Sequence, residues 1–213
     1  MRRLGPIAAL LLTLVLVAAA CSPGDEPAAS SSSSDPQVST TLAPLDIEGI
    51  DDLPPEARAS TGGGDPRSPA YWAVWNSCAP DNRAEQAAAN GGRDAGWFLM
   101  DDFITDPGIQ LGEHLVATCE EGLAYLEGLT ADGEETDDPV YDLAGRLLAA
   151  ELNLSAGAET CPIADEAVLG SHLILSSSGF DGRSSSPFDA EARGALPRLL
   201  ALLDAYNSGN LCG

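Results

Sequence analysis

The sequence contains no lysine, and its ten arginines face 33 acidic residues, which leaves a net charge of −23. A chain this acidic repels the phosphates of nucleic acids and of anionic lipid headgroups. The composition therefore argues against a nucleic-acid partner and against a basic face that docks on a membrane. Two explanations of the acidity stay open: adaptation of the surface to salt, and selective binding of Ca²⁺ or of a cationic partner.

Aromatic residues are few, and none precedes Tyr71. The segment before it is rich in Ser, Pro, Gly and acidic residues, and such a segment buries too little apolar surface to offset the entropy of ordering it. We therefore expect a disordered acidic tether over residues 21–67. Residues 68–213 then form a single domain, which is long enough for one hydrophobic core.

The N-terminus has the layout of a secretory signal. Arg2 and Arg3 precede an apolar run that ends in three alanines, and this run is too short for a comfortable membrane span. Cys21 follows the alanines directly, which resembles the lipobox of bacterial lipoprotein signal peptides. The resemblance implies that residues 1–20 are removed, that the Cys21 thiol is diacylated, and that the mature protein is anchored to a membrane outside the cytoplasm, at the cell surface or in the periplasm.

The other cysteines form an even set, which in an exported chain predicts two disulfides in one of three pairings: Cys78, Cys119, Cys161 and Cys212. No C-x-x-C pair occurs, so a tetrahedral zinc site of the usual kind is not indicated. If the last two helices form an antiparallel hairpin, the start of the first lies beside the end of the second, which places Cys161 next to Cys212. Cys78 would then pair with Cys119.

Helical periodicity dominates the domain. Asp138 and Pro139 are an N-cap followed by proline at the first helical position, and apolar residues recur at three- and four-residue steps after them. Similar starts precede helices at Pro162 and Pro187, and Pro197 inside the last helix predicts a kink or a restart. Further helices are predicted over residues 81–90, 96–104 and 111–126. The expected fold is an all-α, disulfide-stapled bundle of five to seven helices.

Two phrases in the last third of the chain stand out: residues 147–154 (LLAAELNL) followed by Gly157–Ala158, and residues 203–209 (LDAYNSG). They resemble an uncharacterised helical module of secreted and cell-surface bacterial proteins, with L-A-A-x-L-N before G-A and L-D-x-Y-N-x-G near its end. Members often open with G-Y-W-K-N-H, to which residues 71–76 are the nearest counterpart, without the Lys and His. The resemblance implies an extracellular helical domain and no established activity.

Each of the two phrases contains an asparagine, Asn153 and Asn207, close to a glycine at the end of a predicted helix. Asparagine tolerates the left-handed conformation and bonds the last carbonyls of a helix. We therefore expect both residues to cap helix ends rather than to contact a ligand.

One loop between predicted helices concentrates carboxylates: Asp132, Glu134, Glu135, Asp137 and Asp138. Hard oxygen ligands of this kind suit Ca²⁺, although the spacing departs from that of an EF-hand. The loop is thus a candidate Ca²⁺ site, and the alternative is a solvated connection between helices.

A second candidate site combines tryptophans with neighbouring acids: Trp72, Trp75, Trp97, Asp101 and Asp102. Aromatic faces stack on sugar rings while carboxylates bond sugar hydroxyls, and paired acids at a suitable separation hydrolyse glycosidic bonds. The alternative is that the tryptophans belong to the core and that the adjacent acids point in different directions.

The only histidines, His114 and His172, give weak signals for catalysis. Ser171 adjoins His172, but side chains of adjacent helical residues diverge by about 100° and do not form a nucleophile and base pair. Glu113 and Glu120 near His114 match no standard spacing of metal ligands on a helix. Both histidines are expected at the surface or at the edge of the core.

Together these patterns favour a non-enzymatic, lipid-anchored protein whose helical domain binds an envelope protein or glycan or serves a structural role. The rivals are a secreted glycoside hydrolase that uses Asp101, Asp102 or Glu113, and a Ca²⁺-binding surface module. No other cofactor is expected, and the sequence leaves the oligomeric state open.

The anchor has a direct test in Cys21→Ala. Without the thiol no acyl chain is attached, so the protein should move from the membrane fraction to the medium or the periplasm. Fractionation and immunoblotting measure this, with Ser22→Ala as the control that should stay in the membrane fraction. An unlipidated Cys21→Ala protein that stays with the membrane would contradict the lipobox interpretation.

Overall fold

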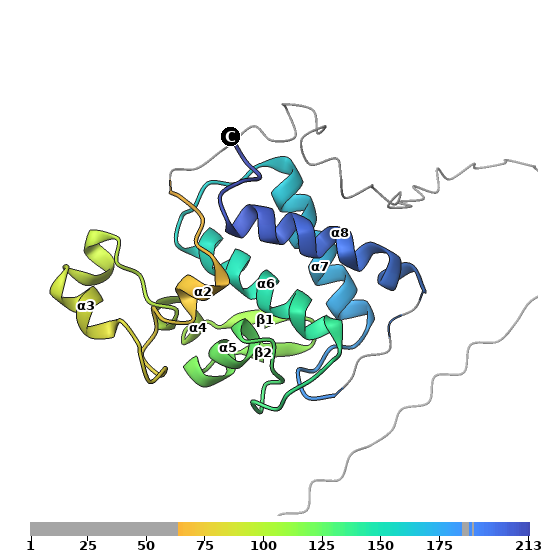
Figure 1. Cartoon of the computed structure of the whole chain (residues 1–213), viewed down its shortest axis with the longest axis horizontal. Helices are drawn as coiled ribbons and strands as arrows, with labels where there is room; N and C mark the ends of the chain where they lie inside the picture. Colours follow the sequence, from red (N-terminus) through yellow and green to blue (C-terminus); the bar gives the residue numbers. More distant parts are fainter. Residues whose placement is uncertain (1–63, 185–187, 189) are drawn as a thin grey trace, which may run out of the picture. The chain divides into compact units, whose positions relative to one another are not determined.

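Figure 1 shows a computed structural model of the chain, which describes residues 64–184, 188 and 190–213. The predicted signal peptide, Cys21 and the predicted tether up to residue 63 lie outside these residues. In the part that the structure describes, no helix is both long enough and apolar enough to cross a membrane.

The described chain is mostly helical, with one short hairpin between its helices. Its elements, in order, are α2 (Pro69–Trp72), α3 (Ala84–Ala89), the 3₁₀ helix η2 (Gly92–Ala95), α4 (Asp101–Ile104), β1 (Ile109–Leu111), β2 (His114–Val116), α5 (Cys119–Leu126), α6 (Pro139–Ser155), α7 (Pro162–Ser177) and α8 (Ala190–Asn207).

Helix α6 lies at the centre of the domain, and α2, α5, β1, α7 and α8 all pack against it (Figure 1). It begins as predicted, because the Asp138 carboxylate accepts a hydrogen bond from the Val140 N–H at 3.2 Å and Pro139 occupies the first turn. Apolar residues then lie on almost every side of the helix, and most of them are fully buried. A helix of this kind is stable only when other elements cover all of its faces.

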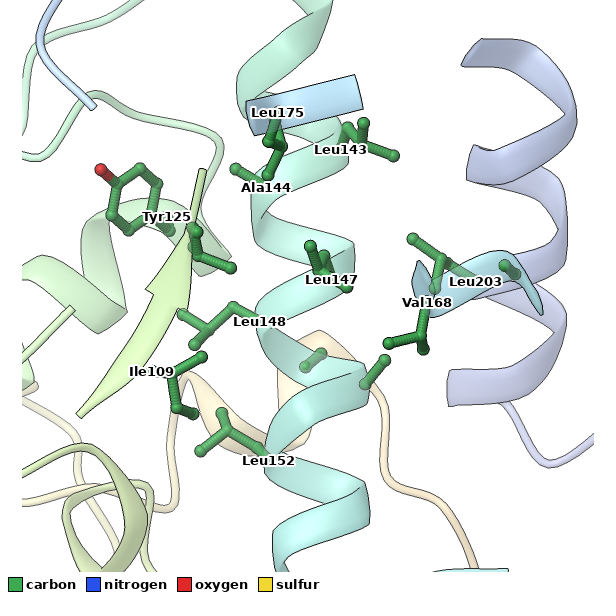
Figure 2. Close-up of a cluster of buried hydrophobic side chains, with 14 of the residues drawn as sticks. Ile109, Tyr125, Leu143, Ala144, Leu147, Leu148, Leu152, Val168, Leu175 and Leu203 are labelled. Atoms are coloured by element: carbon green, nitrogen blue, oxygen red, sulfur yellow. The ribbon is translucent and has the colours of Figure 1, made fainter. Parts of the chain in front are cut away.

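Two sides of α6 form different parts of the core. Leu148 and Leu152 point towards Ile109 of β1, while Leu147 points towards Leu203 of α8 (Figure 2). All of these side chains are buried, and burying one leucine contributes about 1.5–3 kcal/mol. The core is therefore one continuous cluster built around α6.

The helix predicted over residues 111–126 is wrong in its first half, because residues 109–116 form an antiparallel hairpin in which Ile109 pairs with Val116. Burial alternates along both strands, which is the period of a strand and not of a helix. Gly112 stands at the turn with φ +60°, where a helix cannot continue and where a two-residue hairpin turn favours glycine. The helix begins only at Cys119, after the Thr118 hydroxyl accepts a hydrogen bond from the Glu121 N–H at 3.3 Å.

The two short helices predicted near the start of the domain are shorter than expected. Ala84–Ala89 and Asp101–Ile104 are helical, and η2 lies between them. Gly91 and Gly96 flank η2 with φ of 97° and 81°, and this left-handed backbone ends the helices that apolar spacing alone would extend.

Helices α7 and α8 pack against each other as the hairpin argument requires. The structure holds the two predicted disulfides, Cys161 to Cys212 with Cα atoms 5.6 Å apart and Cys78 to Cys119 with Cα atoms 5.9 Å apart. Each closes a loop for which chain entropy predicts about 4 kcal/mol of stabilisation. Helix α8 runs through Pro197 as one element, so the restart predicted there does not occur.

The domain includes four residues that composition assigned to the tether. The Glu159 N–H donates to the Gly64 carbonyl at 2.7 Å, and the backbone of Arg67 is hydrogen-bonded to Asn153. We call residues 64–67 the strap. Within the described residues, the folded domain therefore includes residues 64–67 and not only residues from 68 onwards.

At Gly145 the backbone of α5 approaches α6 closely, since a Cβ atom there would overlap the Tyr125 carbonyl oxygen. Gly145→Ala should therefore push the two helices apart and lower the free energy of unfolding by about 2–3 kcal/mol. Gly194→Ala is the matched control: a Cβ atom at this helical position meets nothing within 4 Å, so the substitution should stabilise by about 1 kcal/mol. Urea unfolding under non-reducing conditions measures both, and equal effects would contradict the close approach.

Candidate functional site

Three aromatic rings form a stack beside α2. The centroid of the Trp75 ring lies 5.3 Å from that of Tyr71 on one side and 5.1 Å from that of Trp97 on the other, with interplanar angles of 11° and 28°. All three side chains are partly exposed. Both faces of Trp75 are covered by its neighbours. Tyr71, at one end of the stack, also contacts Trp72 and Arg67, so Trp97, at the other end, is the ring placed to contact a ligand.

Trp72 does not join this stack, although the sequence grouped it with Trp75 and Trp97. Its side chain is fully buried, with Tyr71 and Phe103 packed edge-on against it. Its Nε1–H donates to the Asn153 side chain at 3.2 Å. Trp72 is a core residue, so the predicted three-tryptophan cleft is not formed.

Asp101 and Asp102 lie in the first turn of α4 and bond to different segments. The Asp101 carboxylate accepts hydrogen bonds from the Ser77 N–H at 2.8 Å and the Ser77 hydroxyl at 2.9 Å. The Asp102 carboxylate accepts one from the Leu99 N–H at 2.8 Å. Both acids hold the loops around α4 in place, and Glu113, the third acid of the hydrolase hypothesis, lies in the hairpin turn on another element.

Asn153 is not a helix cap, contrary to the prediction. It lies inside α6, its side chain is fully buried, and both of its polar atoms are saturated. Its Oδ1 accepts from the Arg67 N–H at 2.8 Å and from Trp72 Nε1 at 3.2 Å, while its Nδ2 donates to the Arg67 carbonyl at 2.8 Å and to Asn207 Oδ1 at 3.0 Å. Since the first two partners are donors only, they fix which end of the amide is oxygen.

Asn207 continues the same chain of hydrogen bonds into α8. Its Oδ1 accepts from Asn153, and its Nδ2 donates to the Arg146 carbonyl of α6 at 3.0 Å. Neither asparagine has a positive φ, a conformation that only glycines adopt among the described residues. The two phrases that stood out in the sequence thus meet through their asparagines, which join α6, α8, α2 and the strap.

The guanidinium group of Arg67 lies among three aromatic rings. Its central carbon is 5.2 Å from the ring centroid of Tyr71, 5.6 Å from that of Trp72 and 5.5 Å from that of Phe98. Each distance is within the range of a cation–π interaction. We call Tyr71, Trp72 and Phe98 the arginine cage. No sequence pattern pointed to it, because its members and Arg67 come together only in the fold.

A groove of about 250 Å³ lies where α2, α5, α6 and α8 meet. Arg146 is one of its lining residues, with Nε 2.6 Å from the Asp204 carboxylate and Nη1 3.6 Å from that of Asp142. Glu127 adds a third acid to the lining. The groove is polar and its only cation is paired, so it suits a small polar or cationic group.

The acidic loop does not gather its carboxylates. Asp132 lies 3.3 Å from Arg183 Nε, Asp138 caps α6, and Glu134, Glu135 and Asp137 are exposed. Within residues 64–184, 188 and 190–213, no three His, Cys, Asp or Glu side chains converge as metal ligands. Ca²⁺ binding by this loop stays a prediction.

His114 is buried beneath the segment that follows α7, beside Tyr125. Its Nε2 is 3.6 Å from a carboxylate oxygen of Glu121, and the Glu120 named with it in the sequence is exposed. Neither His114 Nε2 nor the Tyr125 hydroxyl has a hydrogen-bond partner among the described residues. Burial raises the pKa of Tyr125, and the nearby Tyr141 and Glu121 raise it further.

The turn that covers this cluster is held by Asp181. Its carboxylate accepts hydrogen bonds from the Arg183 N–H, the Ser184 N–H and the Ser184 hydroxyl, and these bonds lower the pKa of Asp181 to about 2. Gly182 of the same turn lies so close to the Tyr125 hydroxyl that a Cβ atom there would overlap it.

His172 and Ser171 diverge as expected of adjacent helical residues. The Ser171 hydroxyl donates to the Ala167 carbonyl at 2.7 Å, whereas His172 Nε2 lies 2.6 Å from the Glu151 carboxylate. The histidine therefore links α7 to α6.

Comparison with known proteins gives no match: no family model, no curated protein and no solved structure is similar to this chain.

The hydrogen bonds of the buried Asn153 and Asn207 side chains should contribute to the stability of the domain. Asn153→Ala leaves Trp72 Nε1–H and both backbone groups of Arg67 without partners, so it should lower the free energy of unfolding by about 3 kcal/mol, and Asn207→Ala by about 1–2 kcal/mol. The double variant should show a coupling of about 1 kcal/mol.

Urea unfolding measures this cycle. Asn90→Ala, at an exposed position after α3, is the control and should change stability by less than about 0.5 kcal/mol. Strict additivity of the Asn153 and Asn207 effects would show that their hydrogen bond contributes nothing.

Proposed function

We propose that this protein is a lipoprotein of the cell envelope, held through Cys21, whose helical domain works by binding a glycan or protein of the envelope. Three features support the proposal. The lipobox-like signal predicts the anchor, and the two disulfides of the domain are compatible with a location outside the cytoplasm. The end of the aromatic stack offers a contact surface.

The partly exposed Trp97 carries the binding part of the proposal. Stacking on Trp75 fixes the orientation of its ring, so little conformational entropy is lost when a ligand contacts it. A tryptophan held in this way is typical of the residues that dominate the energy of an interface. The flat apolar side of a sugar ring fits such a surface, and a glycan is therefore the partner that we favour.

Asp101 and Asp102 have a supporting part in this proposal. The Asp101 carboxylate bonds to the backbone of Ser77, two residues after Trp75, and the Asp102 carboxylate bonds to the backbone of Leu99, two residues after Trp97, so each acid holds the chain next to one ring of the stack. We assign them no role as a catalytic pair.

The proposal predicts that Trp97→Ala weakens binding to the envelope glycan at least fivefold, since the substitution removes the stacking surface and leaves the core intact. The measurement is co-sedimentation of the detergent-solubilised full chain with purified, insoluble cell-wall glycan.

Leu173→Ala is the matched control, because Leu173 is 59% exposed on α7 and belongs to a different element. Its binding should equal that of the unaltered chain. If Trp97→Ala binds as well as Leu173→Ala does, or if the unaltered chain does not sediment with the glycan, the stack is not a glycan-binding surface.

A further inference from the structure

The strap is held by the domain in the way that a binding domain holds a bound peptide. The Asn153 side chain accepts from the N–H and donates to the C=O of the same residue, Arg67, which is the pair of bonds that a neighbouring strand would supply. Three residues earlier, the Gly64 carbonyl accepts from the Glu159 N–H. These bonds use only backbone atoms of the strap, so they fix its course without selecting its sequence.

Selectivity comes from the arginine cage. The ring centroids of Tyr71, Trp72 and Phe98 all lie within 5.6 Å of the central carbon of the Arg67 guanidinium, and aromatic rings attract cations through their negative faces. The planar guanidinium also stacks on rings, which an ammonium group does less well. A neutral side chain of similar length would lose this attraction.

The walls of the cage are held in place by their own packing. Trp72 is fully buried and bonded to Asn153, Phe98 packs on Phe103 with ring centroids 5.4 Å apart, and Tyr71 stacks on Trp75. These contacts do not involve the guanidinium group of Arg67. A preformed site of this kind binds with little reorganisation.

We propose that the arginine cage and the Asn153 amide form a recognition site for an arginine residue in an extended peptide, filled here by the protein's own Arg67. An arginine-containing peptide from another chain competes for the same site by displacing the strap. The net charge of −23 favours the approach of such a cationic peptide. The cage shares Tyr71 with the aromatic stack but does not include Trp97, and the proposal does not rest on the proposed function.

The first experiment removes the Arg67 side chain from the cage and supplies its guanidinium group as a small molecule in solution. The full chain with Arg67→Ala keeps the strap backbone and empties the cage. Propylguanidinium, the side-chain fragment of arginine, should raise its Tm in a saturable manner at millimolar concentration, with an affinity at least tenfold higher than that of the neutral propylurea. The unaltered chain should show at most a fifth of this shift.

Arg67→Ala combined with Phe98→Leu removes one wall of the cage at nearly constant volume, and should weaken propylguanidinium binding at least fivefold. Equal effects of propylguanidinium and propylurea, or no effect of either, would show that the cage is not a cation site.

The second experiment uses the unaltered full chain and therefore stands even if the variants do not fold. A tetrapeptide with the strap sequence, Gly-Asp-Pro-Arg, should accelerate the exchange of the Arg67 amide proton at least fivefold as it displaces the strap. The same peptide with citrulline in place of arginine should have no effect. If neither peptide changes the exchange rate of the Arg67 amide proton, the cage binds only Arg67 of its own chain, and the proposal that it binds a peptide from another chain is wrong.

Discussion

Nearly every face of α6 is buried, and the arrangement of the other elements follows from this constraint. A helix with apolar residues on all of its faces would expose those residues to water if it stood alone, so it needs neighbours on every side. Helices α7 and α8 cover one side, α5 and β1 another, and α2 with the strap covers the end near Asn153. The close approach of α5 requires glycine at position 145, and the contact with α2 and the strap requires a polar side chain that saturates its own hydrogen bonds.

The sequence predicts those parts of the fold in which local signals agree. An N-cap before a proline marks the start of α6, and the same apolar period then continues for four turns. At residues 111–116 the signals conflict: the four-residue step from Leu111 to Leu115 fits a helix, whereas Leu115 is 46% exposed on the opposite face of the hairpin. Gly112 decides between the two structures, because glycine readily adopts a positive φ and the positive φ at that position excludes a continuous helix.

The candidate site was less accessible to sequence reasoning, since it depends on contacts between distant residues. The sequence does not reveal that Trp72 is buried while Trp97 is partly exposed, because α2 is only one turn long and is too short to show a helical pattern of apolar residues. Asn153 and Asn207 lie far apart in the sequence, and only the packing of α6 on α8 joins them. Arg67 was assigned to the tether because the residues before it are of tether composition, although Ser68 and Pro69 just after it form a helix start.

The disulfide between Cys78 and Cys119 also decides how the domain would respond to a force that pulls on its N-terminal end. Such a force, applied at Gly64, loads the hydrogen bonds of the strap first. If these break, α2 and the segment after it extend only as far as Cys78, where the covalent link to Cys119 passes the force directly into α5. A force applied between Gly64 and the C-terminal helices therefore bypasses the forty residues between these cysteines, which include Trp97, and of the two stacked tryptophans only Trp75, before Cys78, is pulled away.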